Sequence, residues 1–292
     1  MKAIVCAQWG GPETLLLQDI PLPEPGPRQI RVKVAAAGVN FPDVLIIQKK
    51  YQMQPPLPFT PGAEIAGTVT AVGAEVTGFT PGMAVAGLCG IGGFAEECVV
   101  DAAQCMPLPP GFAFVDAAAF IMTYATGHHG LVDRGQLKAG ETVLVLGAAG
   151  GVGTAAIQIA KAMGAKVIAA ASSDEKCALC TSIGADATIN YSTQDLRATL
   201  KTLTDGKGPD VIYDPVGGDL AEPALRSIAR RGRYLVIGFA AGPIPALPWN
   251  LPLLKGASIV GVYWGDFARY EPKANAAMMA ELAQWYGQGK IK

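Results

Sequence analysis

The sequence lacks an excess of charge of either sign, and it lacks the long apolar runs of membrane proteins. Its 23 basic and 24 acidic residues leave a net charge of -1, so we expect no broad electrostatic surface for nucleic acid or an anionic membrane. No apolar stretch reaches the ~20 residues that span a bilayer, and the start, MKAIVCAQWGG, does not have the pattern of a secretory leader. The composition predicts a cytoplasmic protein that binds a small molecule.

Histidine and cysteine are also scarce. The two histidines, His128 and His129, are adjacent and so point in different directions on a helix, whereas a catalytic zinc needs three protein ligands and a structural zinc four. Six scattered cysteines are too few for a disulfide framework, so we expect free thiols and no metal. Cys177 and Cys180 have redox spacing, but their position within a predicted helix favours surface thiols without a role.

The 292 residues leave room for two domains, and the pattern of predicted strands, turns and helices changes near Thr123. Before this point, short β-rich runs alternate with turns rich in proline and glycine, which is typical of a small, irregular β domain. The predicted strands of this part are 2–7, 29–36, 66–72, 84–86 and 95–100.

After Thr123, periodic helices alternate with wholly apolar strands. The helix predicted over 151–163 places Val152, Ala155 and Ile159 on one face, and a last amphipathic helix is predicted over 272–286. The predicted strands are 142–146, 166–171, 187–190, 210–214, 233–238 and 258–263. Six such strands predict an α/β fold with a doubly wound parallel sheet, in which 258–263 is an exposed edge that invites a partner subunit.

A glycine-rich turn joins the first of these strands to the first helix. Residues 148–153 read AAGGVG, namely Ala148, Ala149, Gly150, Gly151, Val152 and Gly153. Against the dinucleotide pattern G-x-G-x-x-G, the second glycine lets the backbone approach a pyrophosphate and the third lets the helix pack closely on the strand. Alanine at the first position costs little if its φ is negative. The context favours a dinucleotide site over a plain tight turn.

No acidic residue closes the second strand, where NAD enzymes place the carboxylate that binds the ribose 2′-hydroxyl. Nineteen residues after Gly153 stands Ser172, followed by Ser173 and, a few residues on, Lys176. Two hydroxyls and an ammonium group can bind a 2′-phosphate that a carboxylate would repel. The sequence therefore predicts NADPH, with Tyr191 covering the same pocket, although Lys176 could simply be a solvated helix residue.

The ordered strings AAAGVNFPDVLIIQKKYQ, PFTPGAEIAGTVTAVGAEV, GGFAEECVV, LGAAGGVGTAAIQIAKAMGAKVIAAASS, GADATINY and YDPVGGD cover essentially the whole chain. Together they resemble the zinc-independent, zeta-crystallin-like quinone oxidoreductases of the medium-chain dehydrogenase/reductase superfamily. The resemblance implies a GroES-like catalytic domain over 1–123, a Rossmann domain over 124–263 and a segment, 264–292, that returns toward the catalytic domain. Members run some tens of residues further, so the resemblance implies that the chain is shortened after Lys292.

The resemblance also implies roles for individual residues. Asn40 stands where zinc-dependent relatives place a metal-binding cysteine, and Asp43 and Tyr51 follow at the spacing of the catalytic motif. The implied cofactor contacts are Thr126, Ser172, Lys176 and Tyr191, with Gly238, Phe239, Ala240, Tyr263, Trp264 and Gly265 at the nicotinamide end. The alternatives are a loop cap for Asn40 and Asp43, a surface aromatic for Tyr51, and core packing for Phe239 and Trp264.

The implied reaction is hydride transfer from NADPH to a quinone in an interdomain cleft, carried out by a homodimer without metal. Asn40 or Tyr51 would donate a hydrogen bond to the substrate carbonyl, and the proton would come from water or through Tyr51. The alternatives are an enone or enoyl reductase, for which Lys49 and Lys50 are the candidate contacts to a coenzyme A tail, and an NADPH-binding protein without catalysis. Glu64, an acid in an apolar run, should be paired.

Overall fold

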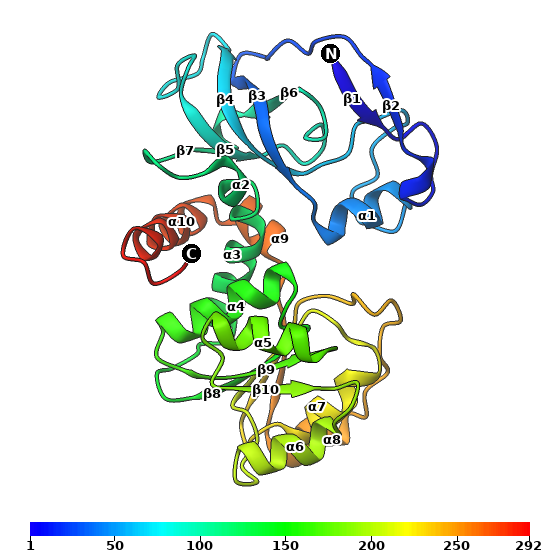
Figure 1. Cartoon of the computed structure of the whole chain (residues 1–292), viewed down its shortest axis with the longest axis vertical. Coiled ribbons are helices and arrows are strands. Elements are labelled where there is room, and N and C mark those ends of the chain that lie inside the picture. Colours follow the sequence, from blue (N-terminus) through cyan, green and yellow to red (C-terminus); the bar gives the residue numbers. More distant parts are fainter. The chain divides into compact units, whose positions relative to one another are not determined.

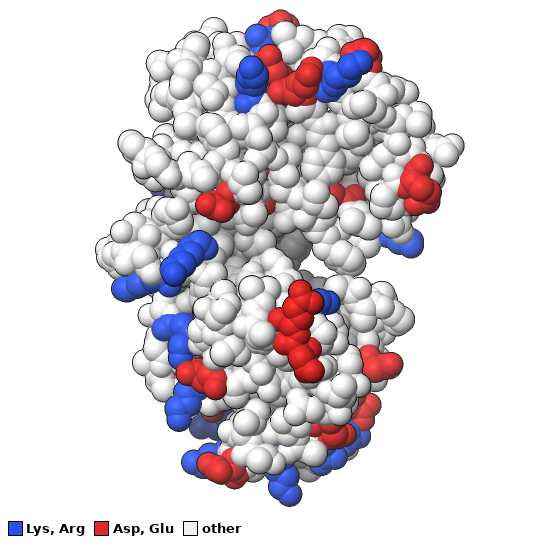
Figure 2. Space-filling model, viewed as in Figure 1, with Lys and Arg blue, Asp and Glu red and all other residues white.

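The structure is a computed structural model that describes residues 1–292, and the chain divides into two compact units, Met1–Met122 and Thr123–Lys292 (Figure 1). We call the first the GroES-like unit and the second the Rossmann unit. The last segment, 264–292, belongs to the Rossmann unit. No helix of the chain is long and apolar enough to cross a membrane. On the face seen in Figure 2, basic and acidic side chains are interspersed over each unit.

The GroES-like unit is built on a five-stranded antiparallel sheet in the order β6-β3-β4-β5-β7. In the longest strand Ile30 and Val32 are buried while Arg31 between them is not, which is the alternation of a strand with one face in a core. The five strands are β3 (Gln29–Gly38), β4 (Glu64–Val72), β5 (Ala84–Leu88), β6 (Glu97–Asp101) and β7 (Cys105–Pro107). A separate antiparallel pair consists of β1 (Lys2–Val5) and β2 (Leu16–Asp19).

Short helices connect these strands. They are α1 (Phe41–Ile47), α2 (Phe114–Ala117) and the 3-10 turns η1 (Pro12–Thr14) and η2 (Ala102–Gln104). The chain leaves the unit in α3 (Ile121–His128), which continues as a π-helix, η3 (His129–Arg134). Strands β2 and β7 lie outside the strands predicted from the sequence.

The Rossmann unit contains a six-stranded parallel sheet in the order β10-β9-β8-β11-β12-β13, so the first strand in sequence lies inside the sheet and β10 and β13 are the edges. This is the doubly wound order of dinucleotide-binding folds. The strands are β8 (Thr142–Leu146), β9 (Lys166–Ala171), β10 (Ala187–Asn190), β11 (Val211–Asp214), β12 (Arg233–Val236) and β13 (Ser258–Gly261). The predicted α/β class with a GroES-like and a Rossmann part is confirmed.

The helices of this unit are α4 (Gly151–Ala162), α5 (Asp174–Ser182), α6 (Leu196–Leu203), η4 (Gly218–Leu220), α7 (Ala221–Ser227), α8 (Asn250–Lys255), α9 (Trp264–Tyr270) and α10 (Pro272–Gly287). Helices α4, α5, α6 and α7 pack on the sheet, whereas α9 and α10 pack on each other. On one side, Leu144 and Leu146 of β8 join Leu200 of α6 and Leu225 of α7 in a core without solvent exposure. The carboxyl ends of the strands are thereby held in place, and the site is built there.

The cysteines require one correction. All six are free thiols, as expected. Cys177 and Cys180, predicted to be surface thiols, are buried, the latter completely. Both lie on α5, whose sequence DEKCALCTS offers few apolar residues, so the two cysteines at i, i+3 spacing supply the face that packs inward.

Candidate functional site

The glycine-rich turn of the Rossmann unit connects β8 to α4. Ala148 is not among the residues with positive φ and is fully buried, so the first position of the motif tolerates alanine as expected. The left-handed residue of the turn is instead Gly147, with φ +56°. A Cβ at Gly153 would lie 2.5 Å from the Gly147 carbonyl oxygen, so only glycine allows α4 to start this close to the turn.

Gly150 is the N-cap of α4 and has no side chain to cap the helix. The first N–H groups of a helix have no partner within it. The backbone N–H groups of Gly151, Val152 and Gly153 thus begin a 12-residue helix whose positive dipole end is suited to a phosphate.

Ser172, Ser173 and Lys176 gather at the end of β9. Lys176 Nζ donates to Ser172 Oγ at 2.9 Å, and Ser173 Oγ accepts from the Lys176 backbone N–H at 3.3 Å as the N-cap of α5. The Asp174 carboxylate accepts from Asn190 Nδ2 at 2.7 Å. One ammonium group and two hydroxyls therefore meet at the position where an acid would select NAD, and the half-buried Tyr191 follows the neighbouring strand β10.

The segment Gly238-Phe239-Ala240 is held against the loop that follows β11. Ala240 N–H donates to the Pro215 carbonyl at 3.1 Å, and a Cβ at Gly217 would lie 2.9 Å from the Phe239 ring. Asp214, 2% exposed, fixes this loop because its Oδ1 accepts from the N–H groups of Val216 and Gly217, both at 2.8 Å. Sequence reasoning did not single out Asp214, although an acid ending a buried apolar strand was a signal for such a role.

The remaining predicted cofactor residues lie on or next to helices. Thr126 is half-buried on α3, one turn after Thr123, whose methyl group would lie 3.1 Å from a Cβ at Gly151, so this face of α3 is directed at the start of α4. Tyr263 is exposed and precedes α9, where Gly265 follows Trp264. Trp264 is buried, and its indole N–H donates to Asn275 Oδ1 at 2.9 Å. The structure thus places Trp264 in helix packing, and its contact with a cofactor stays a prediction.

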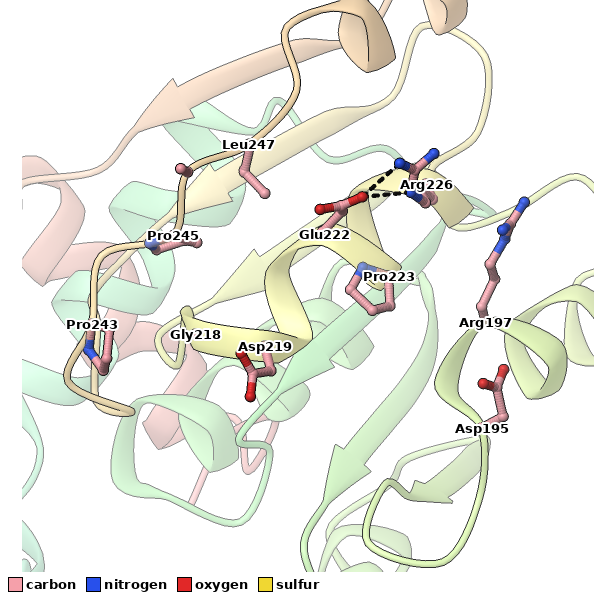
Figure 3. Close-up of a pocket in the computed structure, with 11 residues that line it drawn as sticks. Asp195, Arg197, Gly218, Asp219, Glu222, Pro223, Arg226, Pro243, Pro245 and Leu247 are labelled. Atoms are coloured by element: carbon pink, nitrogen blue, oxygen red, sulfur yellow. Dashed lines mark hydrogen bonds and ion pairs between the residues drawn. The ribbon is translucent and has the colours of Figure 1, made fainter.

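A cavity of about 510 Å³ lies elsewhere on the Rossmann unit, between α6, α7 and the loop before α8 (Figure 3). Arg226 and Glu222 on its wall are paired with each other, at 2.6 Å between Nη2 and Oε1. Its lining is Asp195, Arg197, Gly218, Asp219, Glu222, Pro223, Arg226, Pro243, Pro245, Ala246 and Leu247. None of the predicted site residues lines it.

In the GroES-like unit, the structure brings Asn40, Asp43 and Glu64 together. Asn40 is the N-cap of α1, and Asp43 Oδ2 accepts from its backbone N–H at 2.8 Å in a capping box. Asn40 Nδ2 donates to Glu64 Oε2 at 3.0 Å, and the backbone N–H of Met122 donates to Glu64 Oε1 at 3.1 Å. Glu64 is paired as expected, but with amides instead of a cation.

Both carboxyl groups are buried, Asp43 at 3% exposure and Glu64 at 0%. Burial raises the pKa of Glu64 to about 7, although the hydrogen bonds from Asn40, Met122 and Ile121 oppose the shift. Burial likewise raises the pKa of Asp43, and hydrogen bonds from the backbone of Asn40, Ala63 and Gly62 oppose it. Glu64 is thus an acidic group of the site whose protonation responds to pH near neutrality.

Tyr51 is half-buried and packs on the small core of Cys6, Ile46, Ile47 and Phe59. It follows the C-terminal end of α1, whereas Asn40 caps the N-terminal end, so the seven residues of the helix separate the two by roughly 10 Å along its axis. The catalytic role of Tyr51 stays a prediction.

The two histidines face different partners. His128 Nε2 lies 2.9 Å from Glu281 Oε2 of α10, and His129 Nδ1 lies 3.0 Å from Asp133 Oδ2. Nowhere in the chain do three or more His, Cys, Asp or Glu side chains gather in a way that could hold a metal ion.

Comparisons with known proteins place these features in a family. Residues 26–110 match the family described as the alcohol dehydrogenase GroES-like domain, and residues 151–282 match the one described as zinc-binding dehydrogenase. The chain is 40% identical over 294 residues to the quinone oxidoreductase-like protein 2 homolog of Nematostella vectensis, covering 100% of this chain and 80% of that protein.

Two solved structures share the fold at full coverage of this chain. The Escherichia coli quinone oxidoreductase complexed with NADPH is 30% identical, with a TM-score of 0.92 over 90% of its length. The CurK enoyl reductase is 27% identical, with a TM-score of 0.88 over 89% of its length. The chain therefore belongs to the zinc-independent quinone oxidoreductase family of the medium-chain dehydrogenase/reductase superfamily and is an NAD(P)-dependent oxidoreductase.

Proposed function

We propose that the protein reduces quinones with NADPH, so that NADPH, a proton and a quinone give NADP⁺ and a hydroquinone. The choice of NADPH rests on the Lys176–Ser172 pair at the end of β9. The carboxylate of Asp174, which follows Ser173, is bound to Asn190. A family that includes quinone oxidoreductases, one of them solved with NADPH, supports the same reading.

The residues present fit this cofactor. Lys176, Ser172 and Ser173 would hold the 2′-phosphate through charge-assisted hydrogen bonds. The N–H groups of Gly151, Val152 and Gly153 would hold the pyrophosphate at the start of α4. When bound, NADPH supplies the hydride.

On the substrate side, the proposed donor is the Asn40 side chain. One N–H of its Nδ2 is bound to Glu64, which leaves the second N–H of the same nitrogen for a substrate carbonyl oxygen. A quinone is already electrophilic and its reduced form is stabilised, so positioning and one donor supply most of what the reaction needs. We assign Asp43 to capping α1 and keep Tyr51 as a proton donor to be tested by Tyr51→Phe.

The test is the initial rate of NADPH and NADH oxidation with a panel of small quinones and linear enones, in the presence of a chelator. The expected result is strong preference for NADPH and quinone turnover that survives chelation. Preference for NADH would contradict the Ser172–Lys176 pocket. NADPH that quenches tryptophan fluorescence but is oxidised by no acceptor would make the protein a binding protein instead.

A second candidate activity is the reduction of an enone or enoyl double bond, which uses the same hydride geometry. The likeness to the CurK enoyl reductase favours it. For a coenzyme A substrate, Lys49 and Lys50 are weak candidates, because Lys49 lies 5.8 Å from the Trp9 ring centre and Lys50 donates to Gln48 Oε1 at 2.7 Å. Turnover of enones alone in the panel would select this activity.

We also propose a homodimer formed at β13. This strand is an edge of the Rossmann sheet, and α8, which precedes it, carries exposed Leu253 and Leu254, with Trp249 at its start, each 76–79% exposed. Replacing Leu253 and Leu254 with glutamate should convert a dimer to a monomer in native mass spectrometry. Leu179→Glu, on the exposed side of α5, is the matched control and should leave the dimer intact.

A further inference from the structure

Glu64, the first residue of β4, is an acidic side chain without solvent exposure and without a salt bridge. Its two oxygens have different donors, and the backbone N–H of Ile121 also donates to the carboxyl group. Oε1 accepts from the backbone N–H of Met122 at 3.1 Å, and Oε2 accepts from Asn40 Nδ2 at 3.0 Å.

The fold fixes this arrangement from several sides. Glu64 lies opposite Gly38 of β3 and Leu88 of β5 in the sheet register. A Cβ at Gly38 would lie 2.2 Å from the Ala118 carbonyl oxygen and 3.3 Å from Glu64 Oε2, so glycine lets the segment before α3 approach the carboxyl group. The carboxyl group therefore has little freedom to move.

The backbone donors and the side-chain donor differ in what they can do. The N–H groups of Met122 and Ile121 belong to the backbone and always donate. The Asn40 amide can exchange its nitrogen and oxygen by a rotation of half a turn, which replaces two donors with two acceptor lone pairs and gives up the capping-box contact of its oxygen with the Asp43 backbone N–H. An ionised Glu64 accepts at both oxygens, so it requires the nitrogen of Asn40 to face it.

We propose that Glu64 is a positioning residue that sets which end of the Asn40 amide faces it, and thereby whether Asn40 donates to the substrate or repels it. The inference rests on the proposed function, in which the second N–H of Asn40 binds the substrate oxygen. With the amide rotated, a lone pair of Oδ1 would stand in the place of that N–H.

Protonation of Glu64 would favour the rotated orientation of the Asn40 side-chain amide. Because the Met122 N–H keeps Oε1 as an acceptor, a proton on Glu64 belongs on Oε2, where it faces Asn40 and must donate to Oδ1. Among the groups around Glu64, the titratable one that acts on it is Asp43 of α1. The neighbouring strands β3 and β5 place the uncharged Gly38 and Leu88 opposite Glu64, and the start of α3 supplies backbone N–H groups. Since burial raises the pKa of Glu64 to about 7, we expect the rotation near neutral pH.

Glu64→Gln should hold the Asn40 amide in the rotated orientation at every pH, because glutamine does not titrate. The Met122 N–H takes the single oxygen of the new glutamine side chain, so its NH2 group faces Asn40 and the Asn40 amide must rotate. We expect kcat for quinone reduction at pH 8 to fall about a hundredfold to a thousandfold, the range for losing one donor at a reacting oxygen. Wild type should lose activity below pH 7, whereas Glu64→Gln should be flat, and the exposed Glu75→Gln should behave as wild type.

A double-mutant cycle separates positioning from a general structural effect. If Glu64 acts through Asn40, Glu64→Gln should cause no further loss in an Asn40→Ala background. Losses that add, or a pH inflection that persists in Glu64→Gln and so belongs to Asp43, would overturn the proposal.

A readout without turnover keeps the inference apart from the proposed function. The chain has four asparagines, so ¹⁵N-asparagine labelling gives four side-chain NH2 pairs, and the pair missing in Asn40→Ala is that of Asn40. We expect this pair to titrate near pH 7 in wild type and not in Glu64→Gln. A pair that is constant from pH 6 to 9 would refute the link between Glu64 and Asn40, whereas wild type that titrates but reduces no quinone would refute only the proposed function.

Discussion

The Rossmann unit and the GroES-like unit hold their polar groups in opposite ways. At the end of β9, Lys176 is exposed and meets Ser172 at the surface, and the glycine-rich turn leaves backbone N–H groups free at the start of α4. In the GroES-like unit, Asp43 and Glu64 are buried and are held by amide donors without a salt bridge. The proposed cofactor contacts therefore depend on charge in water and on close backbone packing, whereas the Asn40–Glu64 pair depends on desolvation and hence on pH.

The largest effect on stability is expected where the backbone of the Rossmann unit is packed most closely. Gly153→Ala places a Cβ 2.5 Å from the Gly147 oxygen and 2.7 Å from the Ala148 Cα, both backbone atoms that cannot move away cheaply. Alanine gains up to ~1 kcal/mol of helix propensity, but the overlap outweighs it, and we expect the free energy of unfolding to fall by about 3 kcal/mol.

Gly150→Ala is the matched control, because its Cβ would have only the Gly147 oxygen nearby, at 3.3 Å. Urea denaturation should show this variant to be within about 1 kcal/mol of wild type. If Gly153→Ala is as stable as Gly150→Ala, close packing at the turn does not constrain α4.

The next effect tests desolvation in the GroES-like unit. Because burial raises the pKa of Glu64 from 4.5 to about 7, the folded chain keeps a proton that the unfolded chain releases between these values. The free energy of unfolding should therefore fall as pH rises from about 4.5 to about 7, by roughly 3 kcal/mol from this group.

Glu64→Gln removes this part of the slope, and Glu75→Gln does not, when denaturation is measured across the pH range. A smaller slope of the same sign remains in Glu64→Gln, because burial also raises the pKa of Asp43. A slope in Glu64→Gln equal to that of wild type would mean that Glu64 is already ionised well below neutral pH.

A smaller effect tests charge at the cofactor end. Lys176→Ala removes a charge-assisted hydrogen bond worth ~2 kcal/mol, so KM for NADPH should rise about tenfold to fiftyfold while KM for NADH stays unchanged. Lys166→Ala, at the other end of β9, is the control for net charge. Equal losses for both cofactors would place Lys176 away from the 2′-phosphate.

The smallest effect is expected where charges meet in full exposure. Lys2 Nζ and Asp19 Oδ2 lie 2.6 Å apart with side chains 56% and 71% exposed, so Lys2→Ala should change the free energy of unfolding by less than ~0.5 kcal/mol. Arg233→Met, which breaks a two-pronged pair with the largely buried Glu141, should cost more, about 2 kcal/mol. If Lys2→Ala and Arg233→Met lower the free energy of unfolding equally in thermal or urea denaturation, burial does not strengthen the Arg233–Glu141 pair.

The Rossmann sheet and the glycine turn could be predicted because their signals are local. Apolar strands, helical periodicity and the spacing of Gly150 and Gly153 all lie within one β-turn-α segment. The pairing of Lys176 with Ser172 was accessible for the same reason, since the two are four residues apart.

The Asn40–Glu64 pair could not be predicted beyond the need for a partner. The two residues are 24 apart in sequence, and they meet because the register of β3 and β4 sets Gly38 opposite Glu64. The separation of Tyr51 from Asn40 depends in the same way on α1, a short helix that the sequence analysis did not predict. Such contacts depend on register and packing, which residue spacing does not encode.

The burial of the cysteines has a consequence for survival of the protein in the presence of its proposed substrates. Quinones add to thiolates, and a thiol must ionise before it reacts. No cysteine of the chain is exposed, and burial raises the pKa of Cys6, of Cys105 to about 12 and of Cys180 to about 11. The thiols of Cys6, Cys105 and Cys180 therefore resist ionisation, so we expect them to resist arylation by the quinones that we propose as substrates.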